Sequence, residues 1–384
     1  MIADRKWVER NIGLDPLSRP APLSTFAFRR AANSGGNVHI QDADIQREII
    51  DFDSEGAEGR EFLAFTTATG LSRFTDIPWP SNAPITDKTP HKGRAGALPK
   101  ADVLVVTWTV DEGHALSRVL TPGKDSHSDY VSYTHNYDAI SQDMRAGCPA
   151  RQAKRLGAYW TGSIGNKSVV YFKSDTHMSQ DGPKLPNQKV WTQILQETSP
   201  NLVITTGTAG GIGSQFEVGD VVVSPLVRFD CQKTFRRLDG LQYASSAPNA
   251  TCFALAKALF TANAGQLPKD NTRPPSVTTI GLNQLNAGIL TTDFFGFDTS
   301  NNFYNLQSRG DVSEMGDAVL GMVAKTMGAS APRWIAVRNV SDPQIKAEGT
   351  IRDQAHLAAQ IYKAFGRWST VCSAIVCWAL IVAE

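Results

Sequence analysis

An apolar run that ends in a cluster of glycines constrains this chain most. Residues 201–213 contain no charged residue and carry four glycines within seven positions. Such a run is typical of a strand buried in a sheet that is covered on both faces. Glycines at its end let backbone N–H groups approach a ligand closely. We therefore expect a pocket floored by backbone, with Thr208, Ala209 and Gly210 in contact with a ligand.

The rest of the chain predicts an α/β domain with a mostly parallel, mixed sheet flanked by helices. From Asp102 onward, apolar runs alternate with amphipathic helical patterns, which is typical of parallel sheets with helices on both faces. Residues 1–100 differ, because prolines punctuate polar stretches there. We read them as an N-terminal extension with a Pro-rich linker between Ile77 and Pro99, and residues 101–384 as the catalytic domain. The polar segment Thr121–Gly165 interrupts the alternation and reads as a long loop.

Composition narrows the class of partner. The 38 basic and 37 acidic residues leave no charged footprint for nucleic acid or an anionic membrane, so a small molecule is expected. The five cysteines and seven histidines show no metal-ligand spacing, which predicts no metal and favours reduced, cytoplasmic thiols. The start of the chain is too charged for a secretory signal. The apolar stretch 371–383 is too short to cross a bilayer and predicts a buried C-terminal helix.

Three segments in order carry a family resemblance. They are the glycine cluster of 201–213, Glu314–Ala318 and Val337–Asp342. In this order they resemble the purine nucleoside phosphorylase and nucleosidase superfamily, which cleaves the N-glycosidic bond of nucleosides. The likeness runs from about Asp102 to the C-terminus. It implies a nucleoside phosphorylase-like fold, a homo-oligomer, no cofactor and hydrolysis or phosphorolysis of a purine nucleoside or nucleotide.

Asp342 is the predicted catalytic acid. It follows a strand-like run and precedes Pro343, so we expect it at the carboxyl end of a strand, where open α/β sheets bind ligands. Ser341–Asp342 matches the superfamily motif whose aspartate protonates or hydrogen-bonds the purine N7, with Ser341 as its orienting neighbour. A turn-forming Asp-Pro pair is the alternative. Arg338, in the same strand, is expected to support packing.

Glu112 is the predicted partner of Asp342. Nucleosidases that act on methylthioadenosine and S-adenosylhomocysteine carry a glutamate here, followed by an apolar pair that Ala115 and Leu116 match, and use it to activate water. An acid in the first turn of a helix, favoured by the helix dipole, is the alternative. Asp111 is the fallback for the same role.

The ribose contacts depart from the superfamily pattern. Its usual Glu-Met-Glu has a second glutamate that grips the ribose hydroxyls, and here that position is Gly316. Glu314 and Asp317 are the remaining candidates, although a one-residue shift on a helix turns a side chain by about 100°. Residues 311–314 also fit a capping box, which would give Glu314 a structural role.

Two apolar contacts are carried over from the resemblance. Phe295 matches the phenylalanine that stacks on the purine, although two adjacent aromatic residues often belong to a core. Met315 matches the methionine that packs under the ribose.

The identity of the nucleophile divides the hypotheses. Bacterial-type phosphorylases carry arginines where this chain has Thr205 and residues 106–109, and without them a selective phosphate grip is missing. Hydrolysis is therefore expected. A phosphorylase that uses Arg145 or Arg151 is one alternative. A nucleoside-binding sensor or assembly protein that has lost turnover is another, and Gly316 favours it.

Overall fold

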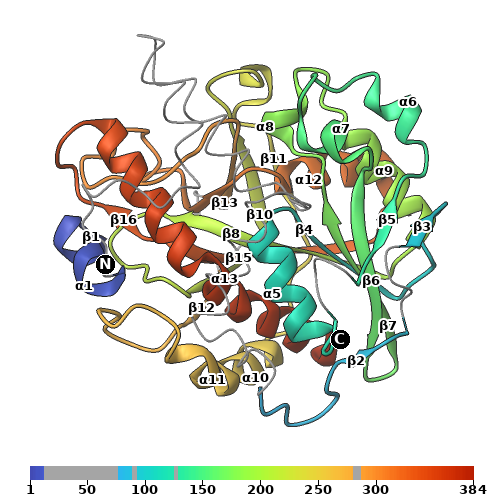
Figure 1. The fold of residues 1–384 in the computed structure, drawn as a ribbon, viewed down its shortest axis with the longest axis horizontal. Coiled ribbons are helices and arrows are strands. Elements are labelled where there is room, and N and C mark those ends of the chain that lie inside the picture. Colours follow the sequence, from blue (N-terminus) through green and yellow to red (C-terminus); the bar gives the residue numbers. More distant parts are fainter. Residues whose placement is uncertain (13–76, 89–92, 125–128, 280–286) are drawn as a thin grey trace.

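One large mixed sheet organises the chain (Figure 1). The computed structural model describes residues 1–12, 77–88, 93–124, 129–279 and 287–384. The main path of the sheet runs β11 (Gln242–Ala244), β10 (Leu226–Asp230), β13 (Ala287–Thr292), β14 (Gly310–Glu314), β8 (Leu202–Gly211), β4 (Val103–Thr107), β7 (Lys167–Ser174), β6 (Gly157–Ile164), β5 (Val131–Tyr133) and β3 (Gly93–Ala95). Off this path lie β15 (Arg333–Asp342), β9 (Val221–Ser224), β12 (Val277–Thr279) and β2 (Ile85–Thr86). The expected α/β fold is confirmed.

The strands at the centre of the sheet are parallel. β8 pairs in parallel with β4 on one side and with β15 on the other, while β14 meets the end of β8 in antiparallel register. The carboxyl ends of β4, β8 and β15 therefore lie at one edge. Contrary to the expected strand followed by a glycine loop, β8 stays extended through the glycines to Gly211.

Two hydrophobic cores cover the two faces of the sheet. Along β4, Val103 and Val105 face one core, and Leu104 and Val106 face the other. This alternation explains why the strand is apolar from Val103 to Val106. One face carries α5 (Val110–Leu120), α10 (Thr251–Leu259), α11 (Thr261–Ala264) and α13 (Ile351–Ala383); the other carries α9 (Asn187–Thr198) and α12 (Asp317–Met327).

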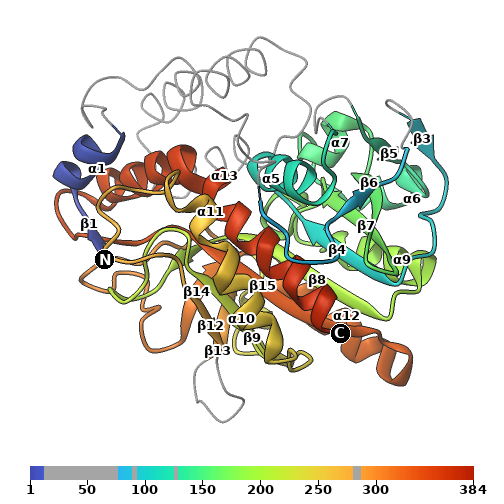
Figure 2. The same cartoon turned by 90° about the horizontal axis from the view of Figure 1, so that it is seen from below.

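Helix α13 dominates its face of the sheet (Figure 2). It is 33 residues long and begins with a capping box in which Thr350 and Asp353 bond each other's backbone N–H groups. Among the described residues it is the one helix whose length and apolar composition suffice to span a bilayer, yet 94% of its most apolar window is buried inside the protein. The expected buried C-terminal helix is thus present, and it starts 20 residues earlier than residue 371.

The first residues pack against the C-terminal part of the chain. β1 (Ile2–Ala3) pairs with β16 (Gln344–Ile345), and α1 (Arg5–Ile12) places Trp7 against Phe365 of α13. Part of the expected wrapping arm is also described: β2 adds to β6, and Trp79 packs on Trp378 of α13 at 4.7 Å between ring centroids. The greater part of the predicted extension, residues 13–76, lies outside the described residues.

Two local predictions are wrong. The segment 121–165 is not a long loop, since it holds β5, β6, α6 (Tyr137–Ser141) and α7 (Pro149–Ala153). Its strands carry polar residues, so their pattern did not predict strands. They lie with β3 in an edge region of the sheet. Residues 311–314 form no capping box, because they belong to β14 and the following helix begins only at Asp317.

Candidate active site

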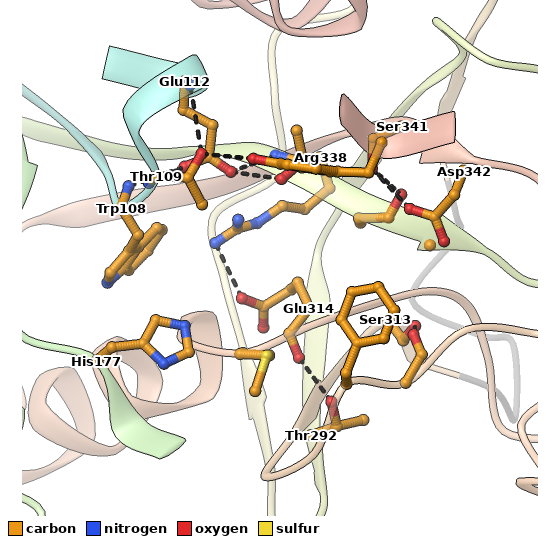
Figure 3. Close-up of a pocket in the computed structure, with 17 residues that line it drawn as sticks. Trp108, Thr109, Glu112, His177, Thr292, Ser313, Glu314, Arg338, Ser341 and Asp342 are labelled. Atoms are coloured by element: carbon orange, nitrogen blue, oxygen red, sulfur yellow. Dashed lines mark hydrogen bonds and ion pairs between the residues drawn. The ribbon is translucent and has the colours of Figure 1, made fainter. Parts of the chain in front are cut away.

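A pocket opens where the carboxyl ends of β4, β8 and β15 meet (Figure 3). The space that it leaves for the centres of water-sized molecules is about 80 Å³. The lining residues are Trp108, Thr109, Glu112, His177, Thr208, Ala209, Gly210, Thr292, Phe295, Gly296, Ser313, Glu314, Met315, Arg338, Ser341, Asp342 and Tyr362.

Nearly all of the sequence-predicted site residues converge on this pocket. Glu112 and Asp342, 230 positions apart in sequence, line it together. The predicted binding residues that also line it are Thr208, Ala209, Gly210, Phe295, Glu314, Met315 and Ser341. Asp317 is the exception, because it is fully buried behind the wall and pairs with Arg338. Contact between Asp317 and a sugar therefore does not fit this geometry.

Asp342 stands at one end of the pocket with one oxygen toward the cavity. An irregularity in the pairing of β15 with β8 lies between Val340 and Asp342, and such bulges redirect the side chains that follow. Ser341 Oγ donates to Asp342 Oδ1 at 2.8 Å. Oδ2 lies against Gly210 and accepts no hydrogen bond from the described part of the chain. Burial raises the pKa of Asp342 to about 7, so near neutral pH this carboxyl can carry a proton.

Glu112 is held in the opposite wall by five hydrogen bonds. It is the third residue of α5 and closes a capping box with Thr109. Its Oε2 accepts from Thr107 Oγ1 at 2.7 Å and from the backbone N–H groups of Trp108 and Thr109 at 2.9 and 2.8 Å. Its Oε1 accepts from the N–H and hydroxyl of Thr208 at 2.7 and 2.6 Å. Glu112 thus ties the start of α5 to β8.

These contacts keep Glu112 ionised. Burial alone would raise its pKa, but the Arg338 charge and the hydrogen bonds from Thr109, Thr208 and Thr107 outweigh it, so the pKa lies below its usual value. A carboxylate has about four lone-pair sites, and five donors fill them. The geometry therefore suits a fixed negative charge better than proton abstraction from water. Asp111, the fallback, turns away and pairs with Arg367 at 2.9 Å.

Gly207 makes room for the Glu112 carboxylate. A Cβ at Gly207 would lie 2.5 Å from Glu112 Cδ, and the backbone there has φ +155°. We expect Gly207→Ala to lower the free energy of unfolding by about 1–3 kcal/mol through overpacking, measured by urea denaturation. Gly265→Ala is the matched control, since a Cβ there meets nothing within 4 Å. Equal stabilities for the two variants would show that the Glu112 seat is not tightly packed.

Arg338 is a pocket residue that the sequence analysis assigned to packing. Its Nε and Nη2 donate to the two oxygens of Asp317 at 2.9 and 2.5 Å, and Nη2 lies 2.9 Å from Glu314 Oε2. The guanidinium also stacks 4.6 Å from the Trp108 ring centroid. Its third nitrogen, Nη1, makes no hydrogen bond to any described residue, so it remains for a ligand or water. The two predicted ribose carboxylates thus serve to hold Arg338.

Glu314 is committed further to the start of α12. Its carboxylate accepts from the hydroxyl of Thr291 and from the backbone N–H groups of Gly316 and Asp317, the two amides at 2.6 and 3.0 Å. Burial and the neighbouring Asp317 charge raise the pKa of Glu314 to about 7. Both oxygens therefore have partners before any ligand arrives.

Trp108 fills the space beside Gly316. A Cβ at Gly316 would lie 2.8 Å from Trp108 Cζ2 and 3.0 Å from Cε2. No side chain fits there while the indole keeps its place. The Trp108 ring also packs near Trp191, with the ring centroids 6.1 Å apart. Gly316, which departs from the superfamily pattern, thus lies against the large side chain of Trp108 in the link between β4 and α5. Only the three-dimensional contact reveals this pair.

His177 is a second residue that the sequence analysis missed. It lies in the segment after β7 and caps α8 (Met178–Asp181), where its Nδ1 accepts from the Ser179 N–H at 3.4 Å. Burial lowers the pKa of His177 to about 3, so the ring is neutral at physiological pH. Nδ1 also lies 2.9 Å from Ser179 Oγ, and the tautomer of the neutral ring decides which of these two atoms donates. No local spacing marks such a residue in sequence.

The sequence of the chain matches the model of the phosphorylase superfamily over residues 132–379. The chain belongs to this superfamily. A 5'-methylthioadenosine/S-adenosylhomocysteine nucleosidase of Oceanobacillus iheyensis is 42% identical over 67 residues, 17% of this chain and 26% of that protein. A DeoD-type purine nucleoside phosphorylase of Exiguobacterium sibiricum is 27% identical over 152 residues, 39% of this chain and 57% of that protein. The alignments therefore span from about a quarter to somewhat over half of these relatives.

Two solved structures are similar to this chain over longer stretches. The crystal structure of the Neisseria meningitidis 5'-methylthioadenosine/S-adenosylhomocysteine nucleosidase with methylthio-immucillin-A is 17% identical, covers 73% of this chain and 98% of that one, and gives a TM-score of 0.43. The native futalosine hydrolase of Helicobacter pylori is 15% identical, covers 73% and 97%, and gives 0.44.

Proposed function

We propose that this protein hydrolyses the N-glycosidic bond of a purine nucleoside or nucleotide and releases the free base. The observation that carries the proposal is the pairing of two acids in one pocket with opposite pKa shifts, upward for Asp342 and downward for Glu112. Two carboxyl groups whose environments separate their pKa values are typical of glycosidic bond cleavage.

In this reaction Asp342 donates its proton to N7 of the base through Oδ2, while Phe295 stacks on the ring. The C1'–N9 bond breaks with its electron pair on the base, and positive charge develops on the sugar. The fixed charge of Glu112 stabilises that cation. A water molecule bound to Arg338 Nη1 adds its oxygen to C1' and then releases a proton to solvent, so free base and free sugar leave.

Water suits the charge of the pocket better than phosphate does. Among the described lining residues, Arg338 is the one Lys or Arg, and Asp317 and Glu314 already neutralise it. A phosphate at C1' would also meet the ionised Glu112. Neither Arg145 nor Arg151, the residues of the phosphorylase alternative, lines the pocket.

Base release with and without phosphate tests the proposal. Purified protein is incubated with adenosine, inosine, guanosine and their 5'-monophosphates, and free bases are separated by chromatography. We expect release in phosphate-free buffer at a rate that phosphate changes less than about twofold. A strict requirement for phosphate, with sugar 1-phosphate as product, would establish the phosphorylase alternative instead.

A nucleoside-binding sensor is the second candidate, and the Trp108–Gly316 contact favours it. Gly316 lacks the carboxylate with which the superfamily typically holds the sugar, and the Trp108 ring fills the adjacent space. Tight nucleoside binding without base release over hours, unchanged by Asp342→Asn, would support the sensor. The homo-oligomer and the cytoplasmic location stay predictions of the family resemblance and of the thiol chemistry.

A further inference from the structure

The pocket has two chemically different ends (Figure 3). Asp342 and Ser341 lie at one end, Trp108 and His177 at the other, and Arg338 and Glu314 between them. If Asp342 protonates the base, as in the proposed function, the sugar must extend toward the Trp108 end. The following inference rests on that proposed function.

The sugar end offers hydrogen-bond donors. His177 donates through Nε2 in the tautomer whose Nδ1 accepts from the Ser179 N–H. Arg338 presents Nη1, since Nε and Nη2 are bound to Asp317 and Glu314. Oxygen atoms that accept, such as the sugar ring oxygen or the attacking water, are therefore well served.

The carboxylates at the sugar end offer no acceptor. Glu112 takes five hydrogen bonds from protein donors. Glu314 is occupied by Thr291, two backbone amides and Arg338. Asp317 is turned to Arg338 behind the wall. A sugar hydroxyl that enters this end brings a proton for which no carboxylate lone pair is left.

The position that could hold a further acceptor is filled by an indole. Gly316 has no side chain, and the Trp108 ring lies where its Cβ would begin. In the proposed reaction C1' must reach a water bound to Arg338 Nη1, and C2' with its hydroxyl is bonded to C1', so the 2'-hydroxyl lies at this end. From this juxtaposition of Trp108, Gly316 and saturated carboxylates we infer that the pocket selects 2'-deoxynucleosides over ribonucleosides.

Binding, rather than turnover, tests the preference, because deoxynucleosides are intrinsically easier to hydrolyse. Asp342→Asn protein is titrated calorimetrically with adenosine and 2'-deoxyadenosine, and with the inosine and guanosine pairs. We expect each 2'-deoxy member that binds to do so at least about fivefold more tightly, the lower end of the effect of one buried unpaired polar group.

Variants in the same background locate the cause. Trp108→Ala with Gly316→Glu clears the indole and adds an acceptor, and we expect it to reverse the preference toward the ribonucleoside. Trp108→Ala alone admits water, and we expect it to bring the affinity ratio close to one; this variant also serves if the double variant does not fold. Gly316→Glu alone has no room beside Trp108 and is expected to lower the melting temperature.

The outcomes separate the two proposals. Equal affinities within the pairs, or tighter ribonucleoside binding, would overturn the deoxynucleoside preference and leave the proposed hydrolysis intact. A ratio that Trp108→Ala does not change would overturn the assignment of the preference to the indole. Failure of every pair to bind would overturn the proposed function itself and the preference with it.

Discussion

Asp342→Asn is expected to lower kcat by about 10²–10⁴-fold, the usual contribution of a general acid. The amide keeps the size of the side chain and the contact with Ser341, but it has no carboxyl proton to give. In the unaltered protein, kcat/KM should fall tenfold per pH unit above about pH 7, because only the protonated form below that pKa donates. The variant should lose this alkaline limb. Initial rates of base release from pH 5 to 9 measure both effects.

Stability provides the control for this variant. A carboxyl with a raised folded-state pKa lowers the stability of the fold as pH rises from its ordinary pKa to the raised value, here about 7. The whole loss is present at pH 8, so Asp342→Asn should melt there at the same temperature or higher. Asp230→Asn is the matched change, because burial also raises the pKa of Asp230, yet it does not line the pocket. It should leave the pH profile unaltered. Glu314 also lines the pocket with a pKa near 7, so the same profile is measured with Glu314→Gln added. An alkaline limb that Glu314→Gln removes and Asp342→Asn does not would refute the acid role.

Glu112→Gln is expected to lower kcat by about 10²–10³-fold, the size of effect seen when one electrostatic partner of a transition state is removed. The amide removes the negative charge beside the sugar. Its NH₂ group must also face either the Thr208 donors or those of Thr107, Trp108 and Thr109. We therefore expect an additional loss of about 1–3 kcal/mol in the free energy of unfolding. Single-turnover rates and urea denaturation separate the two losses.

Glu217→Gln is the matched control for Glu112→Gln. Glu217 is also buried and accepts hydrogen bonds from the backbone N–H groups of Thr272 and Arg273, but it lies outside the pocket lining. It should lose stability and keep kcat. If Glu112→Gln loses only stability, as Glu217→Gln does, then Glu112 is a structural tie between α5 and β8. The sensor hypothesis would gain from that result.

The sequence predicted the sheet well where strands are buried on both faces. The apolar runs 103–106, 202–204 and 334–337 lie in β4, β8 and β15, and alternate residues of each run meet different cores. The segment 121–165 escaped prediction, since its edge-region strands carry polar residues. The glycines of 201–213 suggested a loop, but glycine also permits a strand to pass close to other groups, as Gly207 does beside Glu112.

The site residues that stand at a strand end or a helix start were predictable from the sequence. Asp342 and Glu112 occupy strand-end and helix-start positions that the sequence marks, and the fold brings them together. Arg338, Trp108 and His177 were not predictable in this way. Each draws its importance from partners distant in sequence, as when Trp108 covers Gly316, and a single sequence contains no record of such contacts.

The dependence of the pocket on α13 bears on how the protein is made. Tyr362 of this helix lines the cavity and donates to Thr109 at 3.0 Å, while its later turns cover the sheet. At 5–20 residues per second, ribosomes need on the order of 10–30 s to proceed from β8 to those turns. During that interval one apolar side of the nascent sheet lacks its cover. The pocket is therefore complete only after α13 has left the ribosome and packed on the sheet.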